Sequence, residues 1–192
     1  MNVVAERART VFNAGMITQQ QALRVYEYLM RSREKILEKI RALSAEEYSR
    51  EFAIGLGSLS RTLAHMISSE WYYIQRLQGG EVPAYETWPI RPENPPSFAV
   101  LENAWRTQAQ QTRGALQHVS DWHRAIEYRV TDDAGQAKIV TASAADLFTQ
   151  LALHEVHHRA QALNMLRQLG IVITEDLDFN SMMYARRDAN KA

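Results

Sequence analysis

The spacing of hydrophobic residues along the chain predicts four long amphipathic helices. Apolar side chains recur close to the 3.6-residue period of an α-helix in four segments, which cover residues 19–43, 58–78, 97–119 and 143–170. Helices that each carry one apolar stripe can bury those stripes only against one another. The pattern therefore predicts an all-α protein, folded as an antiparallel up-down four-helix bundle.

Capping signals support the predicted helix ends. Thr18 followed by Gln21, and Ser143 followed by Asp146, match the capping box, in which each side chain satisfies the other residue's free backbone amide. Gly79 directly follows the second segment, where a left-handed residue commonly ends a helix. These signals place the first and fourth helix starts and the second helix end.

Two stretches interrupt the helical pattern. All five prolines fall between residues 83 and 96, so residues 79–97 are expected to form a long irregular crossover between helices 2 and 3. Apolar and polar residues alternate over 124–141 around Asp133-Ala134-Gly135, which predicts a short hairpin or extended segment before helix 4. We interpret residues 1–192 as a single domain with an N-terminal extension, 1–17, and a short fifth helix in the tail.

Composition narrows the function classes. Lys+Arg and Asp+Glu both total 22, and without a basic excess we expect no nucleic-acid partner. The absence of cysteine excludes disulfides, thiolate zinc sites and cysteine nucleophiles. Neither a signal-peptide pattern nor an apolar run long enough to span a bilayer is present. We therefore expect a cytoplasmic protein without a membrane partner.

Two histidines on one face of the predicted fourth helix indicate a metal site. His154 and His158 are one turn apart and share a stripe with Leu151 and Met165. Their spacing allows both imidazoles to reach one cation. A single histidine on an apolar face is usually a hydrogen-bonded core residue, but two such residues would each need a separate buried partner. Metal binding is therefore the favoured interpretation of the pair.

The other histidines carry weaker signals. His65 lies in the middle of the second predicted helix among serine and threonine residues, and spacing alone does not connect it to the pair. His118 lies near a helix C-terminus, where a structural role is expected. His157 is rotated off the metal-binding face and is predicted to be exposed, and His123 is assigned no role.

The string HEVHH also matches the H-E-x-x-H motif of zinc peptidases, in which the glutamate acts as general base. In that alternative, Glu155 would be the base and Glu175 the nearest carboxylate available as a third ligand. Glu175 lies beyond Gly170, which ends the predicted helix. A five-residue motif is short, so the hydrolase stays a minor alternative.

These motifs resemble the DinB-like (damage-inducible, YfiT-related) family of metal-binding four-helix bundles. The resemblance rests on LAHMISSEW around His65, on HEVHHRAQALNMLRQLG in the fourth helix and on the later DLDF, and it extends over residues 18–184. The family usually has glycine where this chain has Ala160, a conservative departure. The resemblance implies that His65, His154 and His158 bind one divalent ion, zinc or nickel, and that the protein forms a homodimer, with Trp71 a candidate for its surface.

Characterised members of the family include transferases and isomerases that use a low-molecular-weight thiol such as mycothiol, bacillithiol or glutathione. The resemblance thus implies a small-molecule substrate, an electrophile, and a thiol co-substrate. Gln161, Tyr72 and Arg76 are the expected cofactor-binding residues, and no catalytic acid or base is assigned. The alternative is a non-catalytic stress-response bundle in which the metal braces the helices or is sensed.

Overall fold

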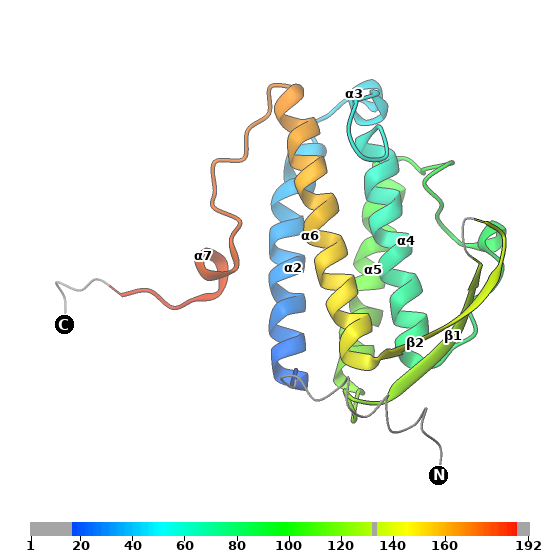
Figure 1. The fold of residues 1–192 in the computed structure, drawn as a ribbon. Coiled ribbons are helices and arrows are strands. Elements are labelled where there is room, and N and C mark those ends of the chain that lie inside the picture. Colours follow the sequence, from blue (N-terminus) through cyan, green and yellow to red (C-terminus); the bar gives the residue numbers. More distant parts are fainter. Residues whose placement is uncertain (1–16, 132–133, 188–192) are drawn as a thin grey trace, which may run out of the picture.

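A computed structural model describes residues 17–131 and 134–187 and shows a mostly helical protein with one small sheet. Its long helices lie side by side (Figure 1). They are α2 (Gln19–Ile40), α4 (Leu59–Gln78), α5 (Phe98–Gln117) and α6 (Ala144–Gln168). The short elements are α3 (Ala45–Ser49), the 3-10 helix η1 (Tyr85–Thr87), α7 (Phe179–Met183) and the strands β1 (Ala125–Thr131) and β2 (Ala137–Ser143). Apart from Ile17, the predicted N-terminal extension lies outside the described residues.

The predicted helix starts agree closely with the structure. Both predicted capping boxes are formed, at Thr18 and at Ser143. A third box at Ser44 begins α3, a helix that the sequence analysis did not identify. Gly79 ends α4 in the left-handed conformation with φ +75°. The short predicted tail helix is α7.

The helix directions do not alternate strictly along the chain, because helices 2 and 3 are joined by the long crossover that the sequence predicted. The start of α2 lies at the end of α5, where Gln19 donates a hydrogen bond to the carbonyl of Gln117. The start of α4 lies near the end of α6, where Thr62 contacts Met165. Helices α2 and α6 therefore run one way, and α4 and α5 the other (Figure 1). The long crossover causes this, because it returns the chain to the end at which α4 began.

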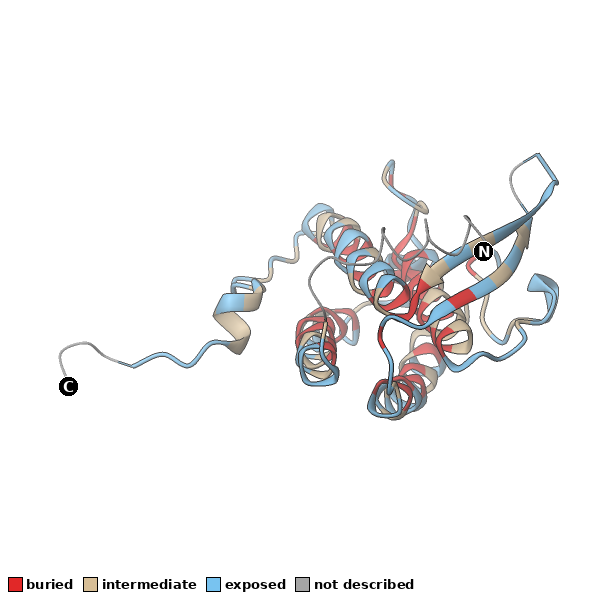
Figure 2. Cartoon of the chain, turned by 60° about the horizontal axis from the view of Figure 1, so that its bottom comes forward, coloured by how far each residue is buried: buried red, intermediate tan, exposed pale blue. Residues whose placement is uncertain are grey.

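The predicted hairpin is present and leads directly into α6. Strands β1 and β2 pair antiparallel, with Ala125 opposite Ser143, which is also the N-cap of α6. Ile126 is buried, whereas most of the hairpin is exposed (Figure 2). The backbone amide of Ala144 donates to the carbonyl of Arg124, which joins the helix start to the strand start. The hairpin thus fixes where α6 begins beside α4.

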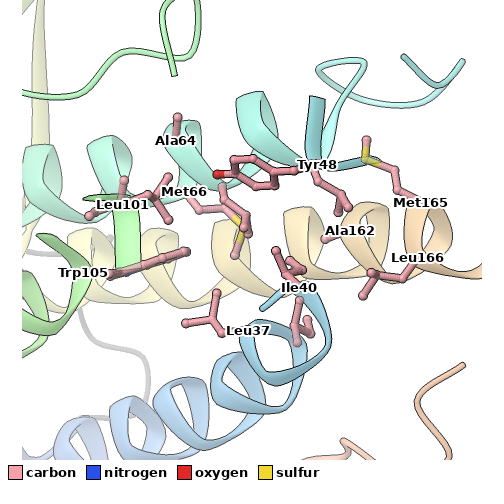
Figure 3. Packing of buried hydrophobic residues seen from close by; sticks show 14 of the residues in the cluster. Leu37, Ile40, Tyr48, Ala64, Met66, Leu101, Trp105, Ala162, Met165 and Leu166 are labelled. Atoms are coloured by element: carbon pink, nitrogen blue, oxygen red, sulfur yellow. The ribbon is translucent and has the colours of Figure 1, made fainter. Parts of the chain in front are cut away.

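The hydrophobic core consists of two apolar clusters, one toward each end of the long helices. The cluster beside α3 includes Ile40, Met66, Trp105 and Leu166 (Figure 3). The cluster beside the hairpin includes Tyr26, Leu29, Ile74, Leu116, Leu147 and Phe148. Between the clusters, each long helix contributes buried polar side chains. This middle layer of polar residues is the distinctive feature of the core.

Glu70 on α4 is the centre of the polar layer. It is 3% exposed, and its two carboxylate oxygens accept four hydrogen bonds. Oε1 accepts from Tyr26 at 2.5 Å and from Thr112 at 2.7 Å. Oε2 accepts from Arg33 and from Trp105, both at 2.8 Å. A buried carboxylate requires such partners, and these come from α2 and α5.

Arg33 extends the network to the fourth helix. Its guanidinium also donates to both carboxylate oxygens of Glu155 on α6, with 2.9 Å from Nε to Oε1. Its Cζ lies 4.2 Å from the centre of the Trp105 ring. Burial alone would lower the pKa of Arg33, but Glu155 and Glu70 together raise it, so the guanidinium stays charged. One network therefore connects all four long helices.

No described helix combines the length and the apolar character that crossing a bilayer requires.

Replacing Glu70 by alanine should destabilise the fold strongly. The substitution leaves the buried Arg33 with one carboxylate partner instead of two and removes the acceptor for Tyr26, Trp105 and Thr112. Breaking a buried ion pair costs about 3–5 kcal/mol of unfolding free energy. Urea unfolding followed by circular dichroism measures the loss. Glu86→Ala, an exposed glutamate in η1, is the control and should change stability by less than about 0.5 kcal/mol. Equal stability of the two variants would contradict the prediction.

Candidate metal centre

Three histidines from two helices meet in the polar layer. His65 on α4 faces His154 and His158 on α6, and the Nε2 atoms of His65 and His154 are 2.9 Å apart. Ring centroids are 4.8 Å apart for His65–His154, 4.6 Å for His65–His158 and 4.4 Å for His154–His158. One ligand atom from each residue lies within 4.8 Å of the others. The structure thus joins His65 to the pair, which spacing could not do.

The rotation of α6 is set by the residues next to the two histidines. Glu155 is paired with Arg33 on α2, and Arg159 donates hydrogen bonds to Ser32 and to Tyr28 on the same helix. Positions 155 and 159 therefore face α2. Because side chains one position earlier are rotated by about 100°, positions 154 and 158 are directed toward α4. The polar network in this way directs the imidazoles to their meeting point.

The three imidazoles could together hold a metal ion. Two nitrogens bound to zinc at about 2.0–2.1 Å in tetrahedral geometry lie roughly 3.3 Å apart. The 2.9 Å separation of the His65 and His154 nitrogens is within a few tenths of an ångström of this value. One ligand atom of His158 lies within 4.8 Å of those of the other two histidines. Imidazole ligands suit zinc, nickel and copper rather than magnesium or calcium.

The protein environment keeps the histidines neutral. Burial, and then the proximity of His158, lowers the pKa of His65 to about 4. Burial, followed by the neighbouring histidines, lowers the pKa of His154 to about 3. Burial also lowers the pKa of His158. Neutral imidazoles offer a free lone pair, so protons compete little with a metal ion at neutral pH.

Gln161 fixes the orientation of His158. Its Oε1 lies 2.9 Å from Nδ1 of His158, and its Nε2 lies 3.0 Å from Nε2 of His157. An Nδ1–H donated to this oxygen leaves Nε2 of His158 as the ligand atom. Gly55, with φ +55°, lies directly against the amide: a Cβ at this position would be 2.3 Å from Oε1. The sequence analysis missed Gly55, although the G-L-G string at 55–57 indicates a tight turn.

The centre borders an open pocket. His65 lines a hollow of about 400 Å³ between α4 and the crossover. The remaining lining residues are Leu56, Ser68, Ser69, Tyr72, Tyr73, Tyr85, Trp88, Pro92 and Glu93. Four of these come from the proline-rich crossover, for which the sequence predicted only irregular structure. Tyr85 donates a hydrogen bond to Glu93 at 2.6 Å.

The remaining predicted residues are distributed around this pocket. Tyr72 lines it, whereas Arg76 lines a neighbouring hollow that also includes Tyr72. Trp71 is half-buried and contacts Trp88, with ring centroids 5.3 Å apart. His157 is exposed, as predicted.

The position of Glu155 argues against the hydrolase alternative. Its side chain is 5% exposed and both oxygens are bound by Arg33, so it is not free to take a proton from water at the metal. Glu175 pairs with Lys35 at 3.6 Å and is not part of the three-histidine group. The third member of that group is His65.

Comparisons with known proteins support the fold. The model of the DinB family matches residues 16–187. A crystal structure of a DinB-like protein from Bacillus cereus ATCC 10987 has the same fold, with a TM-score of 0.56 and 20% sequence identity. The match covers 82% of this chain and 96% of that chain. No curated protein matches the sequence.

Replacing any one of the three clustered histidines by alanine should weaken zinc binding by at least about 100-fold, because the loss of a ligand exceeds the 10–100-fold effect of losing an outer partner. Competition with a chromophoric chelator measures the affinity. His118→Ala is the matched control, since His118 is exposed and its ring bonds to the Gly114 carbonyl, away from the three clustered histidines. Unchanged affinity in His65→Ala would show that His65 is not a ligand.

Proposed function

This chain belongs to the DinB family, and from that premise we propose that it is a metal-dependent enzyme of the four-helix-bundle type. It acts on a small electrophile with a low-molecular-weight thiol as co-substrate, as a transferase or an isomerase. The ion is zinc or nickel, and His65, His154 and His158 hold it.

One observation carries this proposal: three histidines with lowered pKa values lie together, and one of them, His65, lines an open pocket. A structural zinc site has four protein ligands, whereas a catalytic site has three and leaves a position for water or substrate. The pocket beside His65 provides space for a ligand at such a position. A bound divalent ion lowers the pKa of a coordinated thiol and so supplies a thiolate at neutral pH.

The chain's own residues supply orientation and a proton acceptor. Gln161 holds the His158 ring, and Tyr72 forms part of the wall along which the thiol or substrate binds. Glu93 lies on the same wall, and the hydrogen bond from Tyr85 lowers its pKa, so it is ionised at neutral pH. We assign to Glu93 the acceptance of the thiol proton, after which the sulfur lone pair forms the bond to the electrophilic carbon. In a transfer reaction the leaving group, such as the halide of a haloaromatic compound, departs with the electron pair of the bond that breaks.

The non-catalytic alternative also has support in the structure. The histidines come from α4 and α6, so one ion would cross-link two helices. The open pocket favours the enzyme, since a purely structural ion needs no access. The two functions differ experimentally, because a brace would stabilise the fold without binding a thiol.

We also propose which molecules this protein binds: a small-molecule substrate and a second copy of the chain, but no nucleic acid. A small-molecule substrate fits the pocket size, and the net charge of zero fits the absence of a nucleic-acid partner. The family resemblance supports a homodimer.

Zinc- or nickel-loaded protein should catalyse the reaction of mycothiol, bacillithiol or glutathione with an electrophile such as a haloaromatic compound. His154→Ala should lower the rate by at least about 100-fold, because the thiolate is no longer stabilised. The measurement is the consumption of the thiol, or the appearance of the product, with and without metal. His118→Ala serves as the control for a histidine outside the site.

Two results would decide against the enzyme. One is equal turnover by His154→Ala and the unsubstituted protein. The other is a metal-loaded protein that neither binds nor consumes any of the three thiols while its melting temperature falls sharply on chelation, which would favour the brace.

A further inference from the structure

A second hollow adjoins the pocket of the metal centre. It has a volume of about 700 Å³ and lies between the end of α4, the crossover and β1, which are neighbours in Figure 1. Its lining residues are Tyr72, Arg76, Glu81, Val82, Pro83, Ala84, Tyr85, Trp88, Arg129, Val130 and Thr131. Tyr72, Tyr85 and Trp88 also line the pocket beside His65. The two hollows therefore lie side by side along one aromatic wall.

Arg76 lies against two tyrosine rings at this hollow and forms no ion pair with the described residues. Its Cζ lies 5.1 Å from the Tyr72 ring centre and 4.7 Å from that of Tyr128. Its Nε is buried and has no hydrogen-bond partner among the described residues. Its Nη2 has one long bond, 3.4 Å to the carbonyl of Arg129. A guanidinium carries five N–H donors, so most of the donors of Arg76 have no acceptor among the described residues.

Arg129 is the other arginine among the residues that line this hollow. It lies on β1, its side chain is exposed, and within the described part of the chain it forms no ion pair. Glu81 is the one acidic residue among the described lining residues, and it pairs with neither arginine. Among the described lining residues, two arginines thus accompany one acidic residue.

We propose that Arg76 and Arg129 form a subsite for an anionic oxygen group, a carboxylate or a phosphate, on the ligand that reacts at the metal centre. A guanidinium presents a planar set of donors that matches such groups. The rings of Tyr72 and Tyr128 hold the guanidinium of Arg76 in place. Less side-chain entropy is therefore lost when an anion binds to it.

The distance between His65 and Arg76 along α4 sets the length of the ligand. Residues 65 and 76 are eleven positions apart on α4, or about 16 Å along the helix axis at 1.5 Å per residue. The Arg76 guanidinium lies beside Tyr72, which shortens this distance. The ligand is therefore an elongated molecule with a reactive end at the histidines and an anionic end at the arginines. This inference rests on the proposed function for its reactive end, but the anion subsite can be tested without it.

The test uses metal-free protein and simple anions, so no turnover is needed. Arginine Nε–Hε signals are followed by ¹H–¹⁵N NMR during titration with succinate and, separately, with inorganic phosphate at constant ionic strength. The Arg76 signal is identified by its absence in Arg76→Lys. We expect it to shift saturably with at least one anion and not with neutral succinamide. The anion that binds distinguishes a carboxylate from a phosphate ligand.

Arg129→Gln should weaken this binding roughly tenfold, the effect of losing one charge-assisted hydrogen bond. The position is exposed, so the variant is expected to fold. Arg167→Gln, an equal charge change at the far end of α6, should leave the affinity unchanged. No saturable shift with either anion, or equal affinity in Arg129→Gln, would overturn the proposal. Anion binding without thiol turnover would keep the subsite and reject the enzyme.

Discussion

The carboxylate of Glu70, buried among the long helices, is the constraint on which the rest of the structure depends. An isolated charge cannot be buried without partners, and here the partners come from α2 and α5, while Arg33 extends the contact to Glu155 on α6. Apolar packing specifies that the stripes meet, but it tolerates small rotations and slides of one helix against another. A layer in which every polar atom needs a defined partner tolerates neither.

This constraint also makes the metal centre possible. His154 and His158 point at α4 because the residues that follow each of them, Glu155 and Arg159, are bound to α2. The same ion pair removes Glu155 from the chemistry that the H-E-x-x-H string suggests. A sequence motif specifies which residue types are present, whereas the partners of each side chain determine what it can do. In this protein the glutamate of the motif stabilises the fold, and the histidines of the motif belong to the candidate metal site.

The features that depend on local sequence could be predicted, and those that depend on tertiary partners could not. The helix stripes, the capping boxes at Thr18 and Ser143 and the hairpin follow from periodicity and local hydrogen bonding. The parallel run of α4 and α5 depends on where a proline-rich crossover ends, which composition does not indicate. The alignment of His65 with the pair depends on the Glu70 network, and only the family resemblance connected them. Gly55 and the pocket residues Tyr85 and Glu93 lie in irregular segments, for which no periodic signal exists.

The polar layer bears on whether a metal is needed to hold the helices together. Helices α4 and α6 are already connected through Glu70, Arg33 and Glu155, within a core that is apolar on either side of that layer. An ion at the histidines would add one more connection to a pair of helices that the protein has joined by other means. What an ion would add to the fold is a set of open coordination positions directed toward the pocket. The buried network therefore favours a reactive centre over a brace, because it supplies the stability that a brace would add.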